Sequence, residues 1–238
     1  MTEPHLTKTL ASVSTPTLTT VLLKKGLRNV WIRGAAPLAH EPTRVVGRAF
    51  TLNFIPARED LAVPEAWASP TSTRAAIEAA PQGAIVVAAA LGITDAGIFG
   101  DILTARMVKR GLGGLVTDGV VRDIAGVRAT GLPVWAKGTA APPSVAGLIF
   151  TGWNQPIGCG GVAIFPDDII VADADGAVVI PAALAEEIAA LAAEQERLEE
   201  WIMDEVEKGL PLPGLYPPNA ETRARFERER GKAAPRPG

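Results

Sequence analysis

The stretch GDILTARMVKRGLGGLVTDGVVRD, residues 100–123, has one acid near its start and an adjacent Arg-Asp pair at its end. Between them lie a helix-like segment over 101–110 and a short apolar segment, GLVTD, over 114–118. The preceding run GAIVVAAA, residues 83–90, is typical of a buried strand. The order strand, helix, strand favours two parallel strands joined through the helix, and therefore an α/β fold.

This connection brings three charged side chains to one edge of the sheet. A helix of about ten residues travels roughly 15 Å back along the sheet, and five strand residues advance roughly 16 Å. Asp101, beyond the carboxyl end of one strand, would then face Arg122 and Asp123, beyond the carboxyl end of the next. Open α/β sheets bind their ligands at such edges.

The groups at this edge match the chemistry of a 2-oxo acid. The free backbone N–H groups near Gly100, Ile102 and Leu103 can receive a substrate carboxylate, which the helix dipole also favours. Arg122 adds a planar fork for a carboxylate or keto oxygen.

The two acids point to a divalent cation. Asp101 and Asp123 can hold a hard ion directly or through water, as Mg²⁺ requires because it dehydrates reluctantly. The same residues have a purely structural interpretation, in which Asp101 caps its helix and Arg122 and Asp123 form a solvated pair. Spacing alone does not decide between the two.

The rest of the chain predicts one α/β unit over 1–208 and a proline-rich extension over 209–238. The prolines make a continuous helix improbable over 211–218, so we expect the extension to lie extended over its own or a neighbouring chain. We expect disorder in about the last eight residues. The further elements expected are a helix starting at Ser14 or Thr15 and ending at Gly26, a strand within 44–57, a helix over 73–80, short strands in PVWAKG, GGVAIF, IIVAD and AVVIP, and a long helix over about 183–208.

Composition excludes several classes of function. The net charge of −3 and the pI near 5.5 give no general attraction for nucleic acid. The N-terminus lacks the pattern of a signal peptide, and no run of about 18 apolar residues predicts a membrane span. The single cysteine, Cys159, cannot form an internal disulfide. We therefore expect a cytoplasmic protein that binds neither nucleic acid nor membrane.

Other candidate sites carry less weight. Lys137 has apolar neighbours in the sequence and could form a Schiff base, and Cys159 has no histidine that the sequence places beside it. DADG, residues 173–176, predicts a hairpin turn rather than a calcium loop. Asp118 is interpreted as a strand end near the site, with a supporting role left open. The glycines of GLGGLV lie between helix and strand, so they are expected to end the helix rather than bind a nucleotide.

The spacing from Asp101 through twenty residues to Arg122 and Asp123 resembles the D-x20-R-D signature of the class II 4-hydroxy-4-methyl-2-oxoglutarate/4-carboxy-4-hydroxy-2-oxoadipate aldolases, in the RraA-like family. The resemblance extends over FGDILTARMVKRG, GLVTDGVVRD, PVWAKG and CGGVAIFPDDIIVADADGAVVIP, and covers most of residues 20–200. It implies a β/β/α swivelling-type sandwich rather than a Rossmann fold, with a long C-terminal helix. It also implies homotrimers, sometimes paired into hexamers, with sites at the subunit boundaries.

The resemblance assigns roles to individual residues. It implies that Asp123 coordinates Mg²⁺ or Mn²⁺, that Asp101 holds the water shell of the ion, and that Arg122 binds substrate and polarises a metal-bound water. The backbone amides from Gly100 to Leu103, including those of Asp101 and Ile102, would orient the pyruvyl group. A glutamate from the C-terminal helix of a neighbouring subunit would complete the site, with Glu199 the best match and Glu196 the second.

Two functions follow from the resemblance. The first is retro-aldol cleavage of a 4-hydroxy-2-oxo acid to release pyruvate, with oxaloacetate decarboxylation as a side activity. The second is a non-catalytic regulator that binds a protein partner such as ribonuclease E. Members of the regulatory type typically lack the first aspartate, and this chain retains Asp101.

Overall fold

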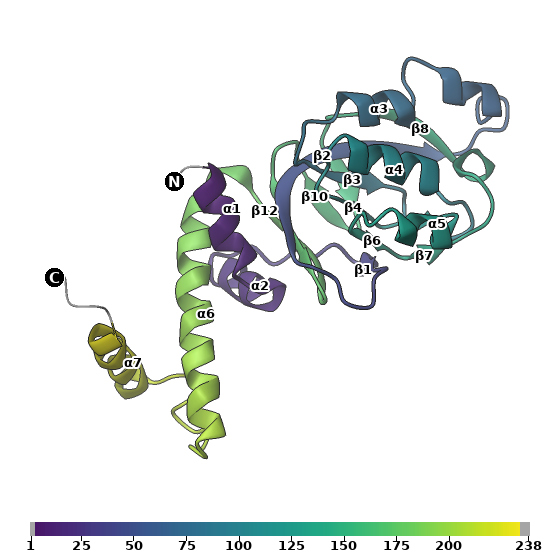
Figure 1. Cartoon of the computed structure of the whole chain (residues 1–238). Helices are drawn as coiled ribbons and strands as arrows, with labels where there is room; N and C mark the ends of the chain where they lie inside the picture. The colour runs from purple at the N-terminus through teal and green to yellow at the C-terminus, as the bar shows by residue number, and fades with distance from the viewer. Residues whose placement is uncertain (1–2, 234–238) are drawn as a thin grey trace.

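The computed structural model describes residues 3–233 as a mixed α/β sheet with a helical extension on one side (Figure 1). The helices are α1 (Glu3–Ala11), α2 (Thr15–Lys24), α3 (Thr73–Ala79), α4 (Asp101–Lys109), α5 (Ile124–Ala129), α6 (Ala185–Glu207) and α7 (Ala220–Ala233). Short 3-10 turns are η1 (Pro64–Ala68), η2 (Ser144–Ala146) and η3 (Ala182–Leu184). The strands are β1 (Ala36–Pro37), β2 (Val45–Pro56), β3 (Ile85–Ala89), β4 (Gly114–Thr117), β5 (Val120–Val121), β6 (Val134–Ala136), β7 (Gly138–Thr139), β8 (Leu148–Trp153), β9 (Ile157–Cys159), β10 (Val162–Ile164), β11 (Ile169–Asp173) and β12 (Gly176–Ile180).

The centre of the main sheet is parallel. Within the described part of the chain this sheet has eight strands, in the order β1-β6-β4-β3-β2-β11-β12, with β8 also pairing with β2. Strands β2, β3, β4 and β6 run parallel, and Val87 of β3 pairs with Val116 of β4. All five residues of β3 are buried, as expected for a strand covered on both faces. The predicted strand–helix–strand connection is confirmed.

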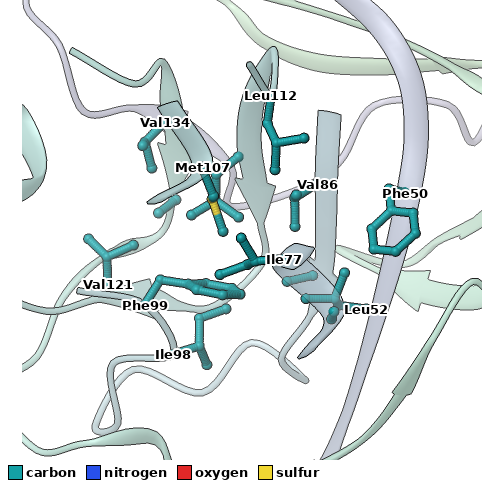
Figure 2. Packing of buried hydrophobic residues seen from close by; sticks show 14 of the residues in the cluster. Phe50, Leu52, Ile77, Val86, Ile98, Phe99, Met107, Leu112, Val121 and Val134 are labelled. Atoms are coloured by element: carbon teal, nitrogen blue, oxygen red, sulfur yellow. The ribbon is translucent and has the colours of Figure 1, made fainter. Parts of the chain in front are cut away.

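Helices α3, α4 and α5 cover one face of the parallel strands (Figure 1). Ile77 of α3 and Met107 of α4 pack against Val86 of β3 and Phe99, which precedes α4 (Figure 2). The opposite face carries the β9–β10 hairpin and a second cluster that includes the fully buried Trp135. The sheet therefore lies between a helical layer and a β layer.

Helices α1, α2 and α6 pack on β11 and β12 at the other side of the sheet from α4 and α5 (Figure 1). Ser14 is the N-cap of α2, and its hydroxyl accepts a hydrogen bond from the Thr17 amide, as predicted. The buried carboxylate of Asp173 accepts from both the amide and the hydroxyl of Thr15. Asp173 is the last residue of β11, so its carboxylate connects the start of α2 to the sheet.

The C-terminal extension departs from the expectation. Turns and irregular backbone occupy residues 209–218, where prolines prevent a helix, but α7 follows over Ala220–Ala233. The segment after Pro218 contains no proline until residue 235, so nothing in it opposes a helix. The helix packs against the chain's own α6, with the rings of Phe226 and Trp201 5.7 Å apart. Of the last eight residues, 231–233 belong to α7, and residues 234–238, where disorder stays a prediction, lie outside the described range.

Other elements agree with the sequence or were missed by it. DADG forms the β11–β12 hairpin turn, with Asp173 opposite Gly176, which confirms the predicted turn. Gly111, the first glycine of GLGGLV, follows the end of α4 at φ 70°, which confirms that a glycine ends this helix. The short helices α1 and α5, and strand β8, were not predicted. No helix among the described residues is long and apolar enough to cross a bilayer.

A buried acid fastens α7 to α6. The Glu205 side chain is 2% exposed and accepts hydrogen bonds from Lys208, at 2.8 Å, and from Arg225 of α7. These bonds, with that of Lys208 the largest cause, hold the pKa of Glu205 below its ordinary value of 4.5. The pKa of Glu229 is also lowered, because its carboxylate accepts hydrogen bonds from the Trp201 N–H and from Arg225.

We predict that acid releases α7. A depressed folded-state pKa means that the stabilisation is complete above the ordinary pKa of 4.5 and is lost as the pH falls through the lowered value. Hydrogen exchange of α7 amides, corrected for intrinsic rates, should therefore show protection at pH 6 that collapses near pH 3. In Glu205→Gln the protection should be weak at both pH values. Protection of α7 that is equal at pH 6 and pH 3 in the unsubstituted chain would contradict this role.

Candidate active site

The first turns of α4 and α5 meet at the carboxyl edge of the parallel strands. Helix α4 begins at Asp101 after the loop that leaves β3, and α5 begins after Arg122 and Asp123, which leave β5. The two helices lie side by side over the sheet (Figure 1). The topology thus brings the three predicted side chains to one seam between two helix starts.

Two glycines allow the close approach of the acids. A Cβ placed on Gly126 of α5 would lie 2.6 Å from Asp101 Cβ and 2.7 Å from Asp101 Oδ2. A Cβ placed on Gly100 would lie 2.6 Å from Asp123 Oδ2. Each carboxylate therefore lies against the backbone at the start of the other helix, and a side chain at either glycine would displace it.

Asp123 adopts a backbone conformation that is uncommon for a residue with a side chain. Its φ of 52° and ψ of 45° lie in the left-handed region, which aspartate tolerates better than most residues. It occupies the N-cap position of α5, but its carboxylate makes no capping hydrogen bond there. The carboxylate instead lies at Gly100 and accepts from Arg122 Nε at 3.1 Å. Such strain is typical of functional positions.

The backbone of Arg122 is fixed by a hydrogen bond, whereas the end of its side chain is accessible. Its amide donates to the Phe99 carbonyl at 2.8 Å, which fixes the start of the Arg122-Asp123 turn against the α4 loop. The Arg122 side chain is 35% exposed, and only its Nε is engaged with Asp123. Within residues 3–233 the terminal guanidinium nitrogens meet no protein acceptor, so they can bind a ligand.

The predicted amide cradle is partly occupied. Asp101 Oδ1 accepts a hydrogen bond from the Ile102 amide at 2.7 Å, so the aspartate engages the first turn of its own helix. In the described chain, the amides of Gly100, Asp101 and Leu103 meet no acceptor, and no side chain caps α4. A bound carboxylate could use these three amides directly, but it could use the Ile102 amide only by displacing Asp101. The Ile102 side chain is among the most exposed apolar groups of the protein.

A groove of about 660 Å³ opens beside this seam. One wall is formed by Arg122, Asp123 and the first turn of α5, and the other by 139–141. The second wall is fixed because β7 pairs with β5, and the Ala140 amide donates to the Val121 carbonyl at 2.9 Å. Asp101 adjoins the groove through its contact with Gly126. The volume is suitable for a small organic acid.

The donor set fits a hydrated divalent ion. No cluster of three or more histidine, cysteine or acidic side chains suited to a metal occurs in the described range. Asp101 and Asp123 offer two carboxylates on one seam, and one oxygen of Asp123 is shared with Arg122. Mg²⁺ typically takes one or two protein carboxylates and keeps several waters, so it matches this arrangement better than an ion that needs a full protein cage.

The two predicted glutamates lie elsewhere in the same chain. Glu199 and Glu196 are on α6, which extends on the other side of the sheet from α4 and α5 (Figure 1). Glu199 accepts from the Thr17 hydroxyl at 3.2 Å, and Glu196 accepts from the Ser14 amide and hydroxyl, each at 3.2 Å. Within one chain they therefore bind α2. Their expected role in a neighbouring subunit's site stays a prediction.

The other candidates from the sequence, Lys137, Cys159 and Asp118, lie in surroundings that favour structural roles. Lys137 is exposed rather than enclosed by apolar groups, and its ammonium donates to the Gly92 carbonyl at 3.1 Å. Cys159 is fully buried, and burial raises the pKa of its thiol, which makes a thiolate nucleophile unfavourable. Asp118 is buried and accepts from the amides of Ala90 and Gly160, so it joins three segments.

Fold and site together define a mixed α/β protein with an Asp, Arg, Asp groove at the carboxyl edge of its parallel strands. Residues 15–179 match the RraA-like family described as Aldolase/RraA, and the chain belongs to this family. A relative from Halalkalibacterium halodurans, named "Putative 4-hydroxy-4-methyl-2-oxoglutarate aldolase", is 36% identical over 174 residues, which cover 70% of this chain and 76% of the relative.

Two solved structures resemble most of the fold. Streptomyces coelicolor RraAS2, described as an unusual member of the RNase ES inhibitor RraA protein family, has 35% identity and a TM-score of 0.75, and the match covers 84% of this chain and 96% of that one. An uncharacterized protein from Pseudomonas syringae pv. tomato has 27% identity and a TM-score of 0.77, covering 90% and 97% of the two chains. These relatives confirm the predicted RraA-type fold.

We predict that Gly126→Ala destabilises the protein although it lies in a helix. Helix propensity alone would favour alanine by about 1 kcal/mol. The new methyl group would overlap Asp101 Cβ, so α4 and α5 must move apart, and the net loss in free energy of unfolding should be about 1–3 kcal/mol in urea titrations. Gly158→Ala is the matched control, because a Cβ there meets nothing within 4 Å. A stabilised Gly126→Ala variant would show that the helices are not in this contact.

Proposed function

We propose that this protein is a divalent-metal-dependent aldolase that cleaves a 4-hydroxy-2-oxo acid of the 4-hydroxy-4-methyl-2-oxoglutarate type and releases pyruvate. Oxaloacetate decarboxylation is the proposed side activity. The observation that carries the proposal is the turn at Asp123, whose left-handed backbone directs its carboxylate to Arg122 and Gly100 beside Asp101. The name of the Halalkalibacterium relative supports the same reaction class.

The proposed cofactor is Mg²⁺ or Mn²⁺. Asp123 would hold it directly, and Asp101 would hold it through water. When bound, a divalent cation supplies Lewis-acid stabilisation of the enolate that forms as the C3–C4 bond breaks. In support, Asp123 lies against Gly100, the residue before Asp101, and Asp101 lies against Gly126 in the helix that follows Asp123.

The chain's own groups bind and orient the substrate. The terminal nitrogens of Arg122 would hold the carboxylate or keto oxygen of the 2-oxo acid, since its Nε already binds Asp123. The amides of Gly100, Asp101 and Leu103 would receive the C1 carboxylate at the positive end of α4. Both contacts fix the reacting carbons beside the carboxylates.

Proton transfer requires a base, because the C4 hydroxyl becomes a carbonyl when the C3–C4 bond breaks. Arg122 stays protonated and cannot accept the proton. The carboxylate of Asp101, directly or through a water, is the proposed acceptor within the chain, since Asp123 is engaged with Arg122. The enolate of pyruvate then takes a proton from water.

The proposal includes assembly into trimers or hexamers in the cytoplasm. Glu199 would reach the site of a neighbouring subunit, and Glu196 is the second choice. In support, Glu199 borders an apolar cavity of about 340 Å³ on α6, where Met203 and Tyr216 are exposed. The free, buried Cys159 fits a reducing compartment.

A second function is favoured by one comparison. Streptomyces coelicolor RraAS2 is described as an unusual member of the RNase ES inhibitor RraA protein family. By analogy, this chain would bind a protein such as a ribonuclease E and cleave nothing. Asp101, which regulatory members typically lack, favours the enzyme.

We predict magnesium-dependent pyruvate release that disappears in Asp123→Asn. The amide cannot offer the anionic oxygen that a hard cation requires, so kcat/KM should fall by roughly 10²- to 10³-fold or more, by analogy with the loss of other charge-stabilising groups. A lactate dehydrogenase-coupled assay with 4-hydroxy-4-methyl-2-oxoglutarate and oxaloacetate, with and without EDTA, measures this loss.

The matched control is Asp175→Asn, the same change in an exposed hairpin turn distant in sequence from the site. It should keep full activity. Absence of turnover for a panel of 2-oxo acids with Mg²⁺ and with Mn²⁺ would reject the aldolase and favour the regulator. Turnover that survives both EDTA and Asp123→Asn would reject the metal site.

A further inference from the structure

A second cavity lies outside the Asp, Arg, Asp groove. It encloses about 220 Å³ between the segment 61–73, the turn η2 and the strand β8. In Figure 1 the 61–73 segment is the blue excursion that ends in α3, on the far side of the molecule from α1. At roughly 30 Å³ per water, the space equals about seven waters, which is the size of a single sugar ring.

The wall of this cavity carries hydroxyl groups that the protein does not use. Thr73 is only 8% exposed, yet in the described chain its hydroxyl meets no hydrogen-bonding partner. The hydroxyl is also not among the fully enclosed polar atoms that lack a partner, and Thr73 lines the cavity. The hydroxyls of Thr71 and Ser144, also in the wall, have no partner within residues 3–233. A buried hydroxyl that faces a cavity is satisfied when a ligand or water binds it.

Two further hydroxyls, those of Ser69 and Ser72, fix the backbone of this wall through hydrogen bonds. Ser72 Oγ accepts from the Ala75 amide and is the N-cap of α3. Ser69 Oγ accepts from the Thr71 amide at 3.1 Å. Both bonds fix the backbone that presents Thr71 and Thr73, so the free hydroxyls have defined positions.

Aromatic rings complete the wall. Trp67 is half-buried, and the guanidinium carbon of Arg74 lies 5.4 Å from the centre of its ring. Phe150 of β8 packs edge-on against Phe54 at 5.2 Å and stacks with Trp153 at 6.3 Å. These contacts restrain both rings, which can present flat apolar surface to a ligand at little entropic loss.

We propose that this cavity binds a small, neutral, polyhydroxylated molecule, such as an aldose or a polyol. The lining residues are alcohols, aliphatics and aromatics, so the wall is uncharged throughout. Hydroxyls that both donate and accept suit the hydroxyls of a sugar, and ring faces suit its C–H surface. An anionic ligand would instead require a cation or a row of free amides.

One short segment connects the cavity with the groove. Ala141 lines the groove and Ser144 lines the cavity, so only two residues lie between them and their Cα atoms are at most roughly 11 Å apart. The connecting segment is held because the Gly97 amide donates to the Pro142 carbonyl at 2.9 Å, and Gly97 also bridges to Val120 of β5. A ligand in the cavity therefore lies one loop away from Arg122, which follows β5.

The test is a binding experiment that does not depend on catalysis. Isothermal titration and saturation-transfer NMR would use D-xylose, L-arabinose, D-glucose, D-galactose and glycerol as probes, each up to high millimolar concentration, with pyruvate and inorganic phosphate as charged comparisons. We expect at least one neutral probe to bind saturably. Pyruvate and phosphate should not displace it.

The variants locate the binding. Thr73→Val keeps the shape and removes the free hydroxyl, and Trp67→Phe keeps a ring of smaller area, so each should weaken binding by tenfold or more. Thr9→Val makes the same chemical change on α1 and should bind like the unsubstituted chain. Circular dichroism and Tm confirm that each variant is folded. No saturable binding by any neutral probe, or affinity unchanged in both Thr73→Val and Trp67→Phe, would overturn the proposal. Either result leaves the pyruvate-release assay unaffected.

Discussion

The starts of α4 and α5 lie close together because each presents a glycine to an aspartate side chain of the other segment, and the candidate active site depends on that contact. Gly100 and Gly126 leave room for the carboxylates of Asp123 and Asp101 to lie against the opposing backbone. Close-packed interiors do not absorb an extra methyl group without moving something, so these two glycines set the spacing of the acids. The spacing in turn decides whether one hydrated cation can join both carboxylates.

The parallel sheet and the strand–helix–strand connection could be predicted because they follow from local signals. A continuous apolar strand, a helix start and a second apolar strand lie in order over 83–118, and their lengths return the chain to one edge. The convergence of Asp101, Arg122 and Asp123 on one seam follows from that geometry. The left-handed turn at Asp123 and the six-residue helix α5 could not be predicted, because neither is long enough to leave a periodic pattern.

The helical extension shows where tertiary contacts override composition. Over 220–230, the part of α7 whose burial is described, Phe226 is the one buried apolar residue and most other residues are charged, so the sequence alone gives little reason to expect docking. Its position depends on Glu205, an acid whose burial on α6 is invisible in the sequence. Helix α1 did leave a signal, since its Leu6 and Leu10, with Val13 just after its end, are spaced for one face of a helix and are all buried. The contacts of Glu199 and Glu196 with the start of α2 could likewise not be predicted, because they depend on how α6 packs.

The most direct test of the shared cation is anomalous diffraction from crystals soaked in Mn²⁺. The account predicts one manganese peak per chain, about 2.1 Å from an Asp123 carboxylate oxygen, with Asp101 reached through a coordinated water. A map with no manganese between these two carboxylates, or with the ion bound by other residues, would contradict it.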